Sequence, residues 1–150
     1  MGTKYKGSED DISTLNAYIA FARASESLTS RLSLLMADYG LTMSQFGILE
    51  VIYHLGPICQ KELGAKLLKS TANITTVLDN LEKKSLVIRK RETGDKRYIL
   101  VYLTPEGKGL ISKLFPIHLK EIKKEFNILT KDEKKSLKTI CKILGKQERD

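Results

Sequence analysis

The chain lacks the features that mark secreted and membrane proteins. Its 150 residues include two cysteines, three prolines and no tryptophan. No apolar run approaches the roughly 18 residues that a membrane-spanning helix needs, and the first residues contain no apolar core of a secretory signal. We therefore expect a cytoplasmic protein with no membrane partner, in which both thiols stay reduced.

The sequence also lacks the short motifs that mark catalytic and phosphate-binding sites. There is no glycine-rich phosphate loop, no Gly-x-Ser-x-Gly elbow and no paired-histidine metal motif. The nitrogen and sulfur ligands are His54, Cys59, His118 and Cys141, and no two of them have the close spacing of a zinc site. These absences predict a protein that is not an enzyme and that needs no metal or other cofactor.

Positive charge is concentrated from residue 60 onward. The formal net charge of +8 divides into −2 for residues 1–59, +5 for residues 60–104 and +5 for residues 105–150. The many lysines between residues 120 and 146 are typical of a solvent-exposed helix face. A second nucleic-acid surface is the alternative interpretation, and we assign no site to these lysines.

Residues 60–103 carry the most informative pattern in the chain. Leucines, isoleucine and valine at helical spacing predict helices over about 60–68 and 71–84, and Ser70 is a natural N-cap for the second. Two β-branched and aromatic runs, 87–91 and 98–103, predict strands joined by a turn in which Gly94 can adopt a positive φ. Basic residues concentrate on this hairpin: Arg89, Lys90, Arg91, Lys96 and Arg97.

The outward face of the second helix is polar but nearly uncharged. With Ile74, Val77 and Leu81 pointing inward, hydroxyl and amide side chains are left facing outward. Such groups suit base edges, since asparagine can pair with adenine through two hydrogen bonds and serine or threonine can bond either base type. The candidate DNA contacts are Ser70, Thr71, Asn73, Thr75 and Thr76 on the helix, with Lys96 and Arg97 at the turn.

These motifs resemble the winged helix-turn-helix core of the MarR (multiple-antibiotic-resistance regulator) family. Asp95-Lys96-Arg97 matches the Asp-x-Arg signature of the family's wing, and residues 103–107 match the Leu-Thr-x-x-Gly run that opens the next helix. There are two departures from the family pattern. Cys59 stands where a serine or threonine usually caps the first helix of the motif, and Leu68 replaces a common turn glycine.

The resemblance implies a sequence-specific, ligand-responsive transcription regulator. A member of this family is expected to act as a homodimer, often as a repressor, and to bind a near-palindromic operator in double-stranded DNA. The carboxylate of Asp95 would repel a neighbouring DNA phosphate. The expected role of Asp95 is therefore to orient Arg97 or to stabilise the turn. The alternative function is a dimeric interaction module, or a protein that binds DNA through its winged helix without sequence preference.

The flanking segments predict a mainly α fold in a single domain, 1–150, with a small β-hairpin wing. A loose tail over 1–11 precedes a long helix to residue 38, and capping boxes at Thr42 and Thr130 open later helices. We expect the DNA-binding part at about 42–104. The helices at about 12–40 and 105–147 have apolar stripes without enough intrachain cover, which predicts that they form the dimer.

Aromatic residues supply a candidate effector pocket. The family often binds small aromatic or lipophilic molecules between the dimer helices and the DNA-binding part. The candidate lining residues here are Tyr18, Phe21, Phe46, Tyr53 and Phe115. Aromatic side chains at helical spacing also form ordinary core, which is the alternative interpretation. Cys59, at a helix N-terminus, could act as a redox sensor or simply as a small buried residue.

Overall fold

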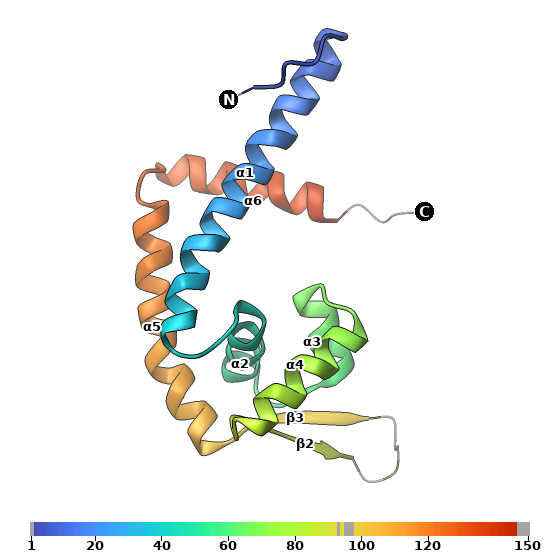
Figure 1. Ribbon diagram of the computed structural model, residues 1–150, viewed down its shortest axis with the longest axis vertical. Helices are drawn as coiled ribbons and strands as arrows, with labels where there is room; N and C mark the ends of the chain where they lie inside the picture. The colour runs from blue at the N-terminus through green and yellow to red at the C-terminus, as the bar shows by residue number, and fades with distance from the viewer. Residues whose placement is uncertain (1, 93, 95–97, 147–150) are drawn as a thin grey trace.

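The computed structural model describes residues 2–92, 94 and 98–146. Its elements in chain order are α1 (Glu9–Asp38), α2 (Met43–Leu55), β1 (Ile58–Cys59), α3 (Gln60–Leu67), α4 (Thr71–Lys83), β2 (Val87–Arg91), β3 (Ile99–Leu103), α5 (Pro105–Phe126) and α6 (Lys131–Gly145). Figure 1 shows α2, α3, α4 and the sheet as one compact unit, from which α1, α5 and α6 extend. The mainly α fold with a small β-hairpin wing is thus confirmed.

The three strands form one antiparallel sheet in the order β1-β3-β2. The predicted hairpin is confirmed, with Arg89 opposite Val101, although β3 begins one residue later than expected. The two-residue strand β1 was not predicted, and it pairs Ile58 with Val101 and Cys59 with Leu100. Because β2 lies at the edge of the sheet, one side of its backbone is left for partners other than a strand.

The first helix begins earlier than the sequence suggested. Ser8 is its N-cap and accepts a hydrogen bond from the Asp11 amide, while the Asp11 carboxylate accepts one from the Ser8 amide. The expectation of a loose tail through residue 11 was therefore wrong, because this capping box satisfies two otherwise unpaired amides. The capping boxes predicted at Thr42 and Thr130 are both present.

One hydrophobic core joins the unit formed by α2, α3, α4 and the sheet to the helices that flank it. It combines the end of α1 with α2, α3, α4, the sheet and α5, as in Met36, Phe46, Leu63, Leu78 and Ile111, which are fully buried. By contrast, α6, all of which is described, has no buried residue. None of the helices within the described ranges is long and apolar enough to cross a membrane.

The beginning of α5 is fixed to the turn that follows α4. Thr104 caps α5, its hydroxyl accepting a hydrogen bond from the Gly107 amide, and it also donates to the Ser85 carbonyl at 2.6 Å. The Leu86 carbonyl accepts a hydrogen bond from the Thr104 amide. Ser85 has a φ of 58°, a left-handed conformation that lets the chain reverse between α4 and β2.

Candidate nucleic-acid interface

A tight turn joins α3 to α4 and sets the position of the second helix. Leu68 ends α3 with φ 52° and ψ 41°, the left-handed conformation that glycine adopts most easily. The Lys69 amide then donates to the Gly64 carbonyl at 2.9 Å. The next residue, Ser70, caps α4 by accepting from the Asn73 amide at 3.2 Å. Leu68 thus occupies the glycine position of the family pattern in the conformation that glycine favours.

The first turns of α4 have the polar, nearly uncharged outward face that the sequence predicted. Ile74, Leu78 and Leu81 are buried, whereas Thr71 and Asn73 are exposed. Thr76 is also exposed, and its hydroxyl donates back to a carbonyl one turn earlier, at 3.1 Å, which leaves its oxygen lone pairs directed outward. These side chains form a surface of hydroxyl and amide groups at the beginning of the helix.

Thr75 lies differently from its neighbours on α4. It is half-buried, and its hydroxyl accepts a hydrogen bond from the Gln60 side chain at 2.9 Å while donating to the Thr71 carbonyl at 3.0 Å. Thr75 therefore joins α3 to α4. The sequence pattern did not indicate this role, because it depends on Gln60, which lies 15 residues earlier in the chain.

The tip of the hairpin is the remaining part of the predicted interface. Asp95, Lys96 and Arg97 lie outside the described residues. On the described strands, the Lys90 ammonium lies 5.3 Å from the centre of the Tyr102 ring, and Arg91 is exposed.

Arg89, expected to add to the charge of the hairpin, is instead paired with α4. Its Nη2 atom donates to Asp79 at 2.5 Å and to Glu82 at 2.7 Å, and its backbone amide donates to Glu82 at 3.0 Å. The hydrogen bond to Glu82 raises the pKa of the guanidinium against the effect of burial. The same bond lowers the pKa of the Glu82 carboxyl. We call these three residues the Arg89 clamp.

The structure separates the five aromatic residues of the predicted effector pocket. Phe46 is in the core, its ring 4.4 Å from that of His118, and Phe115 packs edge to face on His54 at 4.5 Å. Tyr18 is 67% exposed on α1. Phe21 and Tyr53 line two different cavities. A single pocket formed by all five is therefore not found within the described part of one chain.

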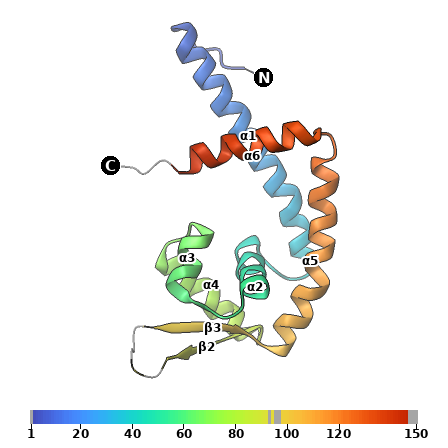
Figure 2. The ribbon, with the colours of Figure 1, turned by 180° about the vertical axis from the view of Figure 1, so that it is seen from behind.

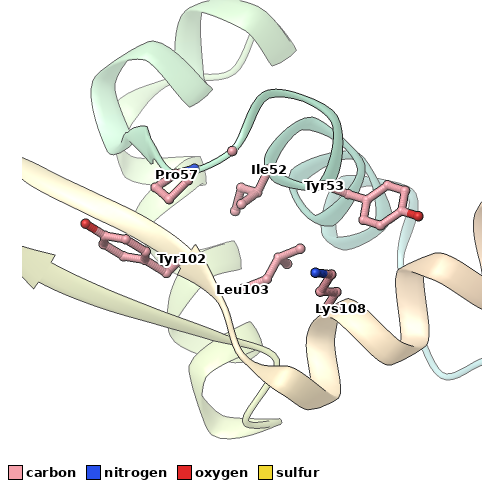
Figure 3. Close-up of a pocket in the computed structure, with 7 residues that line it drawn as sticks. Ile52, Tyr53, Pro57, Tyr102, Leu103 and Lys108 are labelled. Atoms are coloured by element: carbon pink, nitrogen blue, oxygen red, sulfur yellow. The ribbon is translucent and has the colours of Figure 1, made fainter.

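The cavity beside Tyr53 lies where α2, β3 and the beginning of α5 meet. Its volume is about 250 Å³, and Figure 3 shows Tyr53 and Lys108 on one side of it and Tyr102 at the opposite end. The apolar side chains of Ile52 and Leu103 lie between them. The other lining residues are Gly56 and Pro57.

The cavity beside Phe21 is a larger groove between α1 and the α5–α6 corner. Its volume is about 520 Å³, and most of its lining is apolar, including Leu28, Phe126 and Leu137. At its rim, Arg31 on α1 donates two hydrogen bonds to Glu125 on α5, at 2.8 and 2.7 Å. The crossing of α1 over α6 is visible from both sides in Figure 1 and Figure 2.

Taken together, two helices at a tight turn, an outward polar helix face and an adjoining β-hairpin define a winged helix-turn-helix protein. The family model that matches this chain, over residues 41–99, is that of the MarR family. Two curated relatives in Bacillus subtilis are the HTH-type transcriptional regulators YkoM and MhqR. YkoM is 32% identical over 87% of this chain and 85% of its own length, and MhqR is 32% identical over 88% and 91%. The chain belongs to the MarR family of transcriptional regulators.

Solved structures show the same fold. AbsC of Streptomyces coelicolor, a MarR family regulator, has a TM-score of 0.81 at 22% identity and covers 95% of this chain and 100% of its own. A mutant of Escherichia coli MarR, in complex with operator DNA, has a TM-score of 0.73 at 25% identity over 86% and 96%. BpsR of Bordetella bronchiseptica, whose DNA binding is regulated by 6-hydroxynicotinic acid, has a TM-score of 0.78 at 20% identity over 86% and 98%.

Proposed function

We propose that this regulator binds a specific, near-palindromic operator as a homodimer and represses transcription there. The observation that carries the proposal is the exposed, uncharged face of Thr71, Asn73 and Thr76 on α4, in a protein of net charge +8. Lysine and arginine attract the phosphates of any sequence, whereas hydroxyl and amide groups placed in the major groove can discriminate between bases without adding to that attraction. In this proposal Ser70 lies beside these contacts, Lys96 and Arg97 contact the DNA backbone or minor groove, and Asp95 orients Arg97.

A salt titration of matched variants tests this division of roles. Asn73→Ala and Thr76→Ala should each cost about 1–3 kcal/mol per half-site on the operator and little on random DNA, without changing the salt dependence. Arg97→Ala should weaken binding to both duplexes and flatten the slope of log affinity against log salt by about 0.9 for each lost phosphate contact. If Asn73→Ala lost the same affinity on both duplexes, α4 would not read sequence, and DNA binding without sequence preference would be the better description.

A close control exists for Thr76. Thr139 on α6 is also exposed, and its hydroxyl makes the same bond to a carbonyl one turn earlier, at 3.1 Å. Thr139→Ala therefore reproduces the effect of Thr76→Ala on the helix itself, in a helix that makes no proposed contact with DNA. Its affinity for the operator should equal that of the wild-type protein.

The proposed homodimer covers the apolar surface of α6. Leu137, Ile140 and Ile143 are exposed on this helix, and the groove between α1 and the α5–α6 corner is apolar and open. Burial of such surface drives association, and a two-fold dimer would place two copies of α4 about 34–36 Å apart, one turn of DNA. Sedimentation velocity at micromolar concentration should show a dimer. Ile140→Glu should dissociate it and Lys138→Glu should not, whereas a stable wild-type monomer would contradict both the dimer and the palindromic operator.

We also propose that a small aromatic acid releases the protein from its operator. Lys108 can pair with a carboxylate, Ile52 and Leu103 can contact a ring, and the rings of Tyr53 and Tyr102 bound the cavity at its two ends. The volume of about 250 Å³ suits a ligand with a single ring. The regulation of BpsR by 6-hydroxynicotinic acid supports this ligand class. Such a ligand changes DNA affinity only through its different affinity for the free and DNA-bound states, with a typical coupling of about 1–3 kcal/mol.

Titration of the DNA complex with phenolic and hydroxypyridine carboxylic acids tests the effector site. Lys108→Met should raise the ligand concentration needed for release at least about tenfold, since an ion pair is lost. Lys113→Met, an exposed lysine on the same helix, is the matched control and should leave it unchanged. Ligands that bind without altering DNA affinity would reject regulation by this class of compound.

A further inference from the structure

The Arg89 clamp connects the two elements that the proposed function assigns to DNA contact. Asp79 and Glu82 lie one turn apart on α4, and Arg89 lies in the middle of β2, the edge strand that leads to the wing. Figure 1 shows α4 lying alongside the hairpin. The clamp joins the C-terminal half of α4 to the base of the wing, at the strand that forms one edge of the described sheet.

The geometry of the clamp restricts both the position of β2 relative to α4 and the angle between them. The Glu82 carboxylate accepts one hydrogen bond from the backbone amide of Arg89 and another from its guanidinium, at 3.0 and 2.7 Å. A bond to the backbone fixes the strand itself, not only a side chain that can rotate. Asp79 adds a second carboxylate at 2.5 Å on the same guanidinium nitrogen. The strand is therefore linked to α4 at more than one point.

We infer that Arg89 is a positioning residue that sets the angle between α4 and the wing, and that it does not contact DNA phosphate. Both carboxylates are bound to Nη2, so this nitrogen could reach a phosphate only if the two carboxylates were displaced. Ion pairs that stay in contact with solvent contribute little to stability, and here the side chains of Asp79, Glu82 and Arg89 are 49%, 34% and 20% exposed. The clamp therefore affects the geometry of the DNA-binding surface more than the stability of the fold.

This inference rests on the proposed function. It predicts a different result from the one that charge alone would give. Neutralising Asp79 and Glu82 removes negative charge near DNA, which alone would strengthen binding to every duplex. If the clamp positions the wing, the double variant Asp79→Asn/Glu82→Gln should instead lose about tenfold in its preference for operator over random DNA. Glu62→Gln removes an exposed acid from α3 without touching the clamp and should leave that preference unchanged.

The variant Arg89→Ala distinguishes a positioning role of Arg89 from a contact with phosphate. Affinity for the operator should fall while the salt slope stays that of the wild-type protein. A slope lowered by about 0.9 for each subunit, equally on operator and random DNA, would mean that Arg89 contacts phosphate, and the inference would be wrong. The thermal unfolding midpoint of each variant is measured alongside, and Asp79→Asn/Glu82→Gln provides the answer if Arg89→Ala does not fold.

A measurement without DNA keeps the inference distinct from the proposed function. Glu82→Ala removes the acceptor of the Arg89 amide, so hydrogen exchange at that amide and elsewhere in β2 should accelerate at least about tenfold, while β1 and its pairing with β3 keep their protection. Unchanged exchange in β2 would overturn the clamp whatever the DNA experiments show. Accelerated exchange in a protein that has no operator preference would instead reject the proposed function and leave the clamp intact.

Discussion

A methyl group placed on Gly107 would lie 2.0 Å from the carbonyl oxygen of Leu86. That oxygen also accepts the hydrogen bond from the Thr104 amide, so it cannot move away without breaking this bond. Gly107→Ala should therefore lower the free energy of unfolding by about 1–3 kcal/mol or more, as overpacking does in rigid surroundings. Urea denaturation measures the change.

Gly109, two residues further along α5, is the matched control. A methyl group there meets no atom of the described residues within 4 Å. Gly109→Ala should raise the free energy of unfolding by about 0.5–1 kcal/mol, because alanine loses less backbone entropy in a helix. If the two alanine variants changed stability in the same direction, the contact with Leu86 would not explain the glycine of the Leu-Thr-x-x-Gly run.

Leu68 combines a left-handed backbone with a side chain that is 92% exposed. Glycine adopts this conformation without a steric cost, and little apolar burial is lost by removing the side chain. Leu68→Gly should therefore stabilise the protein by about 0.5–1 kcal/mol, the strain of about 1–2 kcal/mol being partly offset by the greater entropy of glycine in the unfolded chain. Leu68→Ala keeps the strained backbone and should change the denaturation midpoint little.

Cys59 is the N-cap of α3, but its side chain makes no capping hydrogen bond to the described first turn. A threonine hydroxyl could accept a hydrogen bond from a first-turn amide, and valine has the same shape without the hydroxyl. Cys59→Thr should therefore be more stable than Cys59→Val by about 1 kcal/mol, the typical contribution of an N-cap. Equal denaturation midpoints for the two variants would show that the hydroxyl finds no such partner.

His118 is 5% exposed between α5 and α2, and neither of its ring nitrogens has a hydrogen-bond partner among the described residues. Burial lowers the pKa of this imidazole from 6.5, outweighing the opposite effect of the Glu50 carboxylate. The unfolded chain therefore binds a proton near pH 6.5 that the folded protein does not bind. The stability contribution of neutral His118 is fully present above that pH and is lost as the pH falls.

His118→Phe should remove this dependence on pH. Between about pH 7.5 and 5.5 the free energy of unfolding of the wild-type protein should decline relative to that of the variant, by at most about 1.4 kcal/mol for each pH unit. Urea denaturation across this range gives the difference. Parallel curves for wild type and His118→Phe would contradict the assignment.

Local signals in the sequence predicted most of the elements but few of the long-range contacts. Ser70, Thr42 and Thr130 begin helices because a capping hydrogen bond involves neighbouring residues only. The strand β1 was missed because its two residues carry no period of their own, and it depends on pairing with β3, whose partner residues lie far later in the chain.

The candidate site also combines features that follow from neighbouring residues with features that depend on residues far apart in the sequence. The face of α4 follows from helical spacing, since Ile74 and Leu78 fix which side is buried. The bonds of Thr75 to Gln60 and of Arg89 to Glu82 join separate elements, and so does the cavity beside Tyr53. The sequence of the hairpin shows that Arg89 is basic. It does not show that carboxylates on α4 bind its guanidinium.

The contact between Leu86 and Gly107 couples the movement of α5 to that of α4. Because the turn after α4 and the first turn of α5 are in contact through backbone atoms, a displacement of one is transmitted to the other. Twenty-two residues of helix extend about 33 Å at 1.5 Å per residue, so a tilt of about 5° at the α6 end displaces the beginning of α5 by about 3 Å. A displacement of that size is comparable to the spacing of adjacent base pairs, about 3.4 Å. In a dimer joined at α6, a small change of angle far from the DNA would therefore shift α4 by about one step along the groove.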